Sequence, residues 1–102
     1  MTKIRLSENG FSVTGHCTAD NNDETGRLVC ASVSSAAYLV ANTITEVVKD
    51  KADITVLEKS GEMHLKVASP SEATKTVLKG FKIHIQQLSE QYPDCIKVIS
   101  EV

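Results

Sequence analysis

The chain has 102 residues, a formal net charge of −2, and 41% hydrophobic and 24% charged residues, which predicts one globular domain over 1–102 with a modest core. The slight negative charge gives no electrostatic basis for nucleic-acid binding. No apolar run approaches the roughly 20 residues of a membrane span, and the start of the chain lacks the apolar segment of a secretion signal.

Alternation and turn residues predict a hairpin at the start of the chain. Apolar residues and cations alternate over 2–6, which is the period of a half-buried strand. The Asn-Gly pair at 9–10 tolerates positive φ and indicates the turn, so the return strand covers 11–14. Gly15 ends this strand where the backbone must bend or approach another group closely.

A long loop and a long helix are predicted next. Residues 17–27 are almost all polar, acidic or small, which favours a loop with few packing contacts. From Leu28 to Asp50 apolar residues recur at steps of three and four, the pattern of a helix with one buried face. Because many of its residues are β-branched, burial rather than propensity must stabilise this helix.

The second half of the chain follows the same order. Alternation predicts a strand over Ile54–Glu58 and another over 63–67, joined by a turn. The Ser-Pro-Ser-Glu run at 69–72 is typical of a helix start, with Ser69 as the cap and proline in the first turn. A strand over 95–102 closes the chain. The order β-β-α-β-β-α-β predicts an α+β fold, an α/β sandwich of two helices on a sheet of about five strands.

The cysteine pattern bears on compartment and cofactors. Three cysteines (Cys17, Cys30 and Cys95) in a short chain do not suggest a disulfide framework, so the expected location is a reducing cytoplasm. No two cysteines have metal-binding spacing and no histidine clusters with them, so we expect no metal and no other cofactor. Cys95 is expected in the core, and His64 and His84 at the surface.

Two reactive residues flank the predicted loop. Cys30 is expected in the first turn of the long helix, where the dipole and free N–H groups stabilise a thiolate and a developing oxyanion. His16, at the end of the second strand, could take the thiol proton and return it to a leaving amine. The pair indicates a cysteine-dependent hydrolase.

Residue types alone leave alternatives open. Cys17 adjoins His16 and could be the nucleophile instead, and a free cysteine often only fills space in a core. The acids Asp20, Asp23 and Glu24 could orient His16 or simply form a solvated loop. A non-catalytic binding or assembly module, whose loop contacts a partner, is the alternative function.

Two motifs carry a resemblance to a known family. Thr-Gly-His at 14–16 and Leu-Val-Cys-Ala-Ser-Val-Ser at 28–34 are similar to the ribosomal-processing cysteine protease family. The similarity covers the whole chain, including the strand at 61–67 and the closing segment at 88–98.

The resemblance implies that His16 and Cys30 form a catalytic dyad, with Gly15 and Ser34 as supporting residues. It implies a bacterial homodimer that removes the N-terminal extension of a large-subunit ribosomal protein precursor. Many members carry an acid three residues before the cysteine, where this chain has Arg27, so the group that orients His16 stays open. The alternative becomes a non-catalytic, ribosome-associated binding or assembly module.

Overall fold

The computed structural model describes residues 1–15, 23–57 and 60–102, and it has the predicted element order. The predicted α+β class, with five strands and two helices, is confirmed. The strands are β1 (Thr2–Ser7), β2 (Gly10–Thr14), β3 (Ala52–Leu57), β4 (Glu62–Val67) and β5 (Ile96–Ser100). The helices are α1 (Asp23–Asn42), which continues as the π-helical segment η1 (Thr43–Val48), and α2 (Glu72–Gln91).

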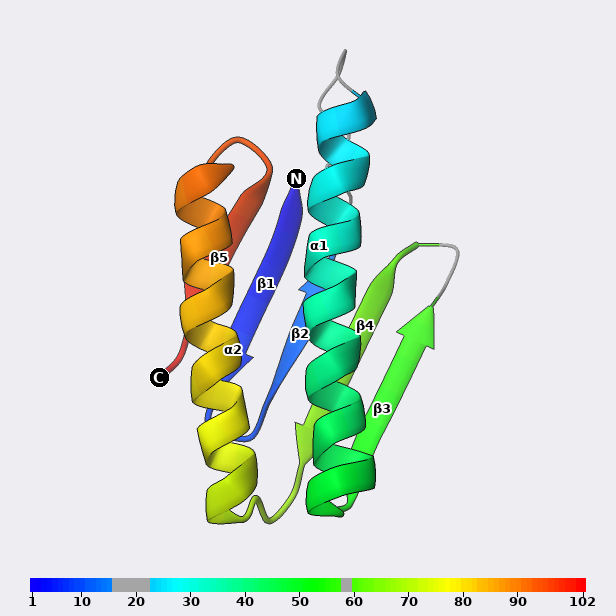
Figure 1. Cartoon of the computed structure of the whole chain (residues 1–102), viewed down its shortest axis with the longest axis vertical. Helices are drawn as coiled ribbons and strands as arrows, with labels where there is room; N and C mark the ends of the chain where they lie inside the picture. The colour runs from blue at the N-terminus through cyan, green and yellow to red at the C-terminus, as the bar shows by residue number, and fades with distance from the viewer. Residues whose placement is uncertain (16–22, 58–59) are drawn as a thin grey trace.

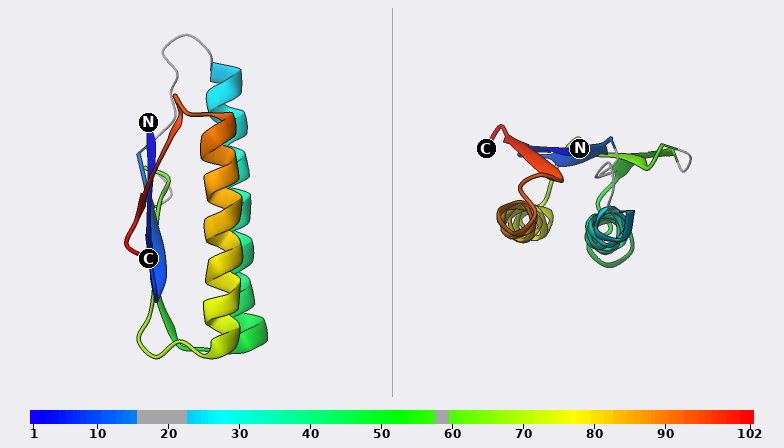
Figure 2. Two further views of the ribbon diagram at one scale, coloured as in Figure 1. Left: turned by 90° about the vertical axis from the view of Figure 1, so that its left-hand side faces the viewer. Right: turned by 90° about the horizontal axis from the view of Figure 1, so that it is seen from above.

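All five strands form one mixed sheet in the order β3-β4-β2-β1-β5. Neighbouring strands are antiparallel except β1 and β5, which pair in parallel and bring the two ends of the chain together. Both helices lie on the same face of the sheet and run alongside each other (Figures 1 and 2). In the part of the chain that the structure describes, no helix lies on the opposite face of the sheet (Figure 2).

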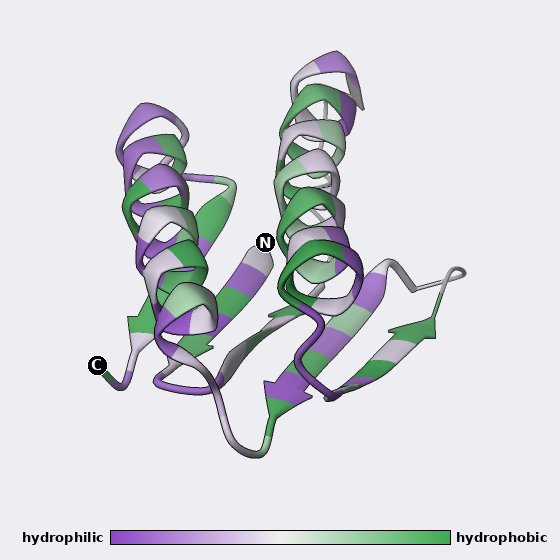
Figure 3. Cartoon of the chain, turned by 60° about the horizontal axis from the view of Figure 1, so that its bottom comes forward, coloured by the Kyte–Doolittle hydropathy of each residue, from purple (hydrophilic) through white to green (hydrophobic). Residues whose placement is uncertain are grey.

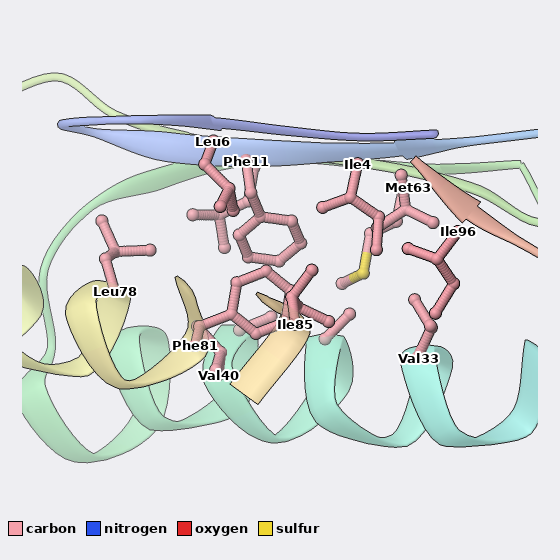
Figure 4. Close-up of a cluster of buried hydrophobic side chains, with 14 of the residues drawn as sticks. Ile4, Leu6, Phe11, Val33, Val40, Met63, Leu78, Phe81, Ile85 and Ile96 are labelled. Carbon is pink, nitrogen blue, oxygen red and sulfur yellow. The ribbon is translucent and has the colours of Figure 1, made fainter. Parts of the chain in front are cut away.

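The core lies between the sheet and the two helices (Figure 4). Alternate residues of the strands point toward the helices, as the period of two requires. Phe11 of β2 and Phe81 of α2 meet with ring centroids 4.5 Å apart, a tilted pair that contributes roughly 0.5–1.5 kcal/mol beyond its buried area. The least exposed apolar side chains, at 0–1%, are Ile4, Val29, Val33, Ala37, Ile44, Val67 and Ile85.

The predicted boundaries differ from the observed ones at several elements. The first helix starts at Asp23 rather than Leu28, because the polar turn before the apolar stripe is helical as well. The strand predicted at Ile54–Glu58 begins at Ala52, and Glu58 lies outside the described residues. The second helix is capped by Ser71 instead of Ser69, since the Ser71 side chain accepts a hydrogen bond from the Thr74 N–H.

The carboxylate of Asp50, just after η1, forms hydrogen bonds to the start of α2. Asp50 Oδ2 accepts hydrogen bonds from the Ser71 N–H at 2.9 Å, the Ser71 hydroxyl at 2.8 Å and the Thr74 hydroxyl at 2.5 Å. The Thr74 hydroxyl, followed by the two Ser71 donors, lowers the pKa of Asp50 below its ordinary value of 3.8. Thr74 is fully buried, so this contact also provides the partner that its hydroxyl needs.

The lowered pKa of Asp50 predicts an acid-sensitive contribution to stability. A group with a lowered folded-state pKa stabilises the fold above its unfolded value of 3.8, and this contribution is lost as the pH falls through the folded-state pKa. We expect Asp50→Asn to lower the urea midpoint at about pH 7 and to differ less from the unaltered chain at about pH 3. A midpoint difference that stays constant between the two pH values would contradict this role.

Candidate active site

Cys30 lies inside α1 rather than at its start. It is the eighth residue of the helix, half-buried, and packs against the edge of the hydrophobic core. The expectation that Cys30 occupies the first helical turn is therefore wrong. The free N–H groups of a helix belong to its first four residues. Cys30 lies beyond them, so the start of this helix cannot supply oxyanion donors at the sulfur.

The residues around Cys30 on α1 define the surroundings of the sulfur. Ser34 lies one turn further along the same side of the helix and is exposed. Arg27 is exposed three residues before Cys30, within the helix instead of the predicted loop. Cys30 and Ser34 thus lie one turn apart on the same side of α1, with Cys30 against the core and Ser34 at the surface.

Gly15 ends β2 as predicted, in a conformation that favours glycine. Its φ is +78°, and a Cβ at this position would overlap the Met1 carbonyl oxygen. Both constraints explain why a glycine stands directly before His16. His16 itself, with Cys17 and Asp20, lies outside the described residues, so the dyad distance stays a prediction.

Thr2 is a residue that the sequence reasoning missed at this end of the sheet. Its Cα would lie 3.8 Å from a Cβ at Gly15, and its side chain is 2% exposed. Among the described residues, its hydroxyl oxygen has no hydrogen-bond partner. The signal was present in the sequence, because Thr2 is in phase with Ile4 and Leu6 on the core side of β1.

A pocket of about 270 Å³ opens beside Ser34. It lies between one side of α1 and the adjoining ends of β3 and β4. Its apolar lining comes from Val13, Ala37, Tyr38, Val56, Leu57 and Met63, and Ser34, Gly61 and Glu62 complete it. Cys30 is not among its lining residues, but Ser34 follows Cys30 by four positions, about 6 Å along the helix axis.

The remaining candidates lie away from this site. Cys95 is buried, as predicted, but it is disulfide-bonded, which corrects the expectation of a chain without disulfides. Cys30 is free. His64 and His84 are exposed, as predicted. Within 1–15, 23–57 and 60–102, no group of three or more potential metal ligands occurs.

The half-buried position of Cys30 predicts that its side chain matters little for folding. Cys30→Ser should change the free energy of unfolding by about 1 kcal/mol or less, because the sulfur lies at the margin of the core. Val33→Ala is the matched control on the same helix. Val33 is 1% exposed, so this change should cost roughly 2 kcal/mol. Equal losses in urea titrations of the two variants would make Cys30 a core residue.

A family model and solved structures both match this chain, and both name the same protease. A family model described as cysteine protease Prp matches residues 1–97. No match was found among curated protein sequences. The structure is similar to that of the essential ribosomal processing protease Prp from S. aureus in complex with a substrate peptide, with a TM-score of 0.81, 18% identity and coverage of 98% of this chain and 97% of that one.

Two further solved structures share the fold. The S. aureus protease with a covalently linked product peptide gives a TM-score of 0.78 at 17% identity, over 98% of this chain and 97% of that one. SMU.848 from Streptococcus mutans gives a TM-score of 0.79 at 17% identity, over 97% of this chain and 90% of that one.

Proposed function

The chain belongs to the cysteine protease Prp family, and from this premise we propose that it removes the N-terminal extension of a large-subunit ribosomal protein precursor in the bacterial cytoplasm. We assign Cys30 as the nucleophile and His16 as the general base. The observation that carries this proposal is the family match over residues 1–97, which includes both residues. The free thiol of Cys30, half-buried against the core, supports the assignment.

The proposed mechanism is covalent catalysis by a thiol. His16 takes the proton of Cys30 as the sulfur attacks the scissile carbonyl carbon, and the carbonyl oxygen becomes an oxyanion. Collapse of this intermediate breaks the C–N bond, and His16 returns the proton to the leaving amine. Water then hydrolyses the thioester. The product peptide covalently linked to the S. aureus protease is consistent with such a mechanism in that relative.

The position of Cys30 limits where the oxyanion donors can come from. Because Cys30 is eight residues into α1, the free N–H groups of the first turn are not adjacent to the sulfur. The oxyanion donors must therefore be other groups, such as side chains or N–H groups from another segment. The sequence-based expectation that the first-turn N–H groups stabilise the oxyanion is therefore wrong.

A peptide spanning the junction of the extension tests the mechanism. Cys30→Ala and Cys30→Ser should abolish cleavage, His16→Ala should remove most of the rate, and Cys17→Ala should remove little. Mass spectrometry of the products measures each rate. Full activity in Cys30→Ala, or loss only in Cys17→Ala, would assign the nucleophile elsewhere.

We also propose that the chain forms a homodimer through the outward faces of α1 and α2. The segment Glu24–Val48 is long and apolar enough to cross a membrane, but its fully buried residues pack on the sheet, as a core helix requires. Only 33% of its most apolar window is buried, and hydrophobic residues also occupy its outward side (Figure 3).

The outward faces of the two helices offer a suitable contact surface. Between them runs an apolar groove of about 820 Å³, and a Cβ at Gly80 within it would meet no atom within 4 Å. Leu39 and Ile83 remain 68% and 58% exposed. A second copy covering this face would remove that apolar surface from water.

Sedimentation tests the homodimer. We expect a dimer at tens of micromolar, with an interface that buries over about 1,000 Å² in total. Leu39→Glu should shift the equilibrium to the monomer, because a buried unpaired carboxylate is costly. Lys97→Glu on β5 is the control and should leave the sedimentation coefficient unchanged. A monomer in the unaltered chain would contradict the proposal.

A further inference from the structure

β3 is an edge strand of the sheet. Among the described strands it pairs only with β4, so its other side leaves backbone N–H and C=O groups without a strand partner. Proteins commonly protect such edges with lysine, proline or a bulge. The sequence of β3, Ala-Asp-Ile-Thr-Val-Leu, contains neither lysine nor proline, and Asp53 is its one charged residue. Its register with β4 is continuous over all six residues, so no bulge interrupts it.

The apolar residues of this edge strand are left uncovered by α1. Ile54 and Val56 pair with Leu65 and Met63, which face the core, so they lie on the helix side of the sheet. They are nevertheless 40% and 37% exposed, and Leu57 is 49% exposed. Val56 and Leu57 also line the pocket beside Ser34, so the strand with the free edge forms one wall of that pocket.

The pocket has the size and lining for part of a peptide. Its volume of about 270 Å³ falls below the roughly 300–1,000 Å³ of pockets that enclose whole small ligands. A single apolar side chain suits it better, because Val13, Ala37 and Met63 are buried in its wall. Tyr38, 44% exposed on α1, borders the pocket and can cover one face of such a side chain.

We propose that the substrate binds as an extended segment along the free edge of β3 and places one apolar side chain in the pocket beside Ser34. This inference rests on the proposed function, and it adds the element that holds the peptide. An edge strand recognises an extended chain through main-chain hydrogen bonds, while a side-chain pocket selects the sequence. Ser34 follows Cys30 by four positions, which is about 6 Å along the helix axis. An extended peptide covers that distance in about two residues.

Two lysine substitutions on β3 separate this role from a general effect of charge. Val56→Lys places a cation in the pocket, whereas Thr55→Lys places the same cation on the opposite, helix-free side of the strand. With the junction peptide, Val56→Lys should raise KM about tenfold or more and leave kcat within about twofold. Thr55→Lys should leave both constants within about twofold. The alkylation rate of Cys30 by iodoacetamide should be unchanged in both variants, which shows that the nucleophile is intact.

A second substitution at Val56 tests the proposal if the lysine variant does not fold. Val56→Thr has nearly the volume of valine and suits a strand, so it replaces the lysine variant if that chain does not fold, with a smaller rise in KM. An unchanged KM in the Val56 variants, or equal changes in the Val56 and Thr55 variants, would overturn the proposal. If the Val56 variants lose self-association without a change in KM, the edge of β3 binds a second copy of the chain, and this result would also overturn the proposal.

Failure of the proposed protease function can be distinguished from failure of the peptide site on β3. If the unaltered chain does not cleave the peptide, the cysteine protease assignment to this substrate fails, and binding is measured by fluorescence anisotropy of the labelled peptide. Weaker binding in Val56→Lys but not in Thr55→Lys would still support the peptide site on β3. Equal binding in all chains would reject the site independently of catalysis.

Discussion

The packing of one face of α1 on the sheet determines the geometry of the candidate site. Val29, Val33 and Ala37 are at most 1% exposed against the strands, and this sets the rotation of the helix about its axis. Each residue turns the helix by about 100°, so Cys30 lies on the side of this buried face that is turned toward Ser34. The sulfur is therefore half-buried, close to solvent and next to the side of α1 that borders β3 and β4.

Most of the fold could be predicted from periodicity, because each element has one buried face. Phe11, Val13, Met63 and Leu65 alternate as strand residues should, and all four are buried. Helix starts were harder to place. The first turn of α1, Asp-Glu-Thr-Gly-Arg, has no apolar residue and therefore no periodic signal. The Ser71 cap depends on Asp50, a contact across 21 residues that local patterns do not encode.

The site was predictable in composition but not in geometry. Gly15 carries the positive φ that its place at a strand end suggested, and Ser34 lines a pocket one turn from Cys30. The predicted position of Cys30 in the first helical turn was wrong, because the helix start was predicted at Leu28 and lies at Asp23. Tyr38, Val56 and Glu62 meet at the pocket from distant segments, so only the tertiary structure brings them together. At 17–18% identity the relatives keep the fold, which needs a buried pattern more than particular residues.

The parallel pairing of β1 with β5 has a consequence for how the protein is made. Thr2 pairs with Ile96 and Leu6 with Ser100, so the central strand β1 lacks one neighbour until residues 96–100 have been synthesised. Contacts between residues so far apart in sequence form slowly, because closing a long loop costs entropy before the pairing repays it. During synthesis β1 is an open edge, exposed to pairing with other chains. The sheet is therefore completed only after residues 96–100 have been synthesised and pair with β1.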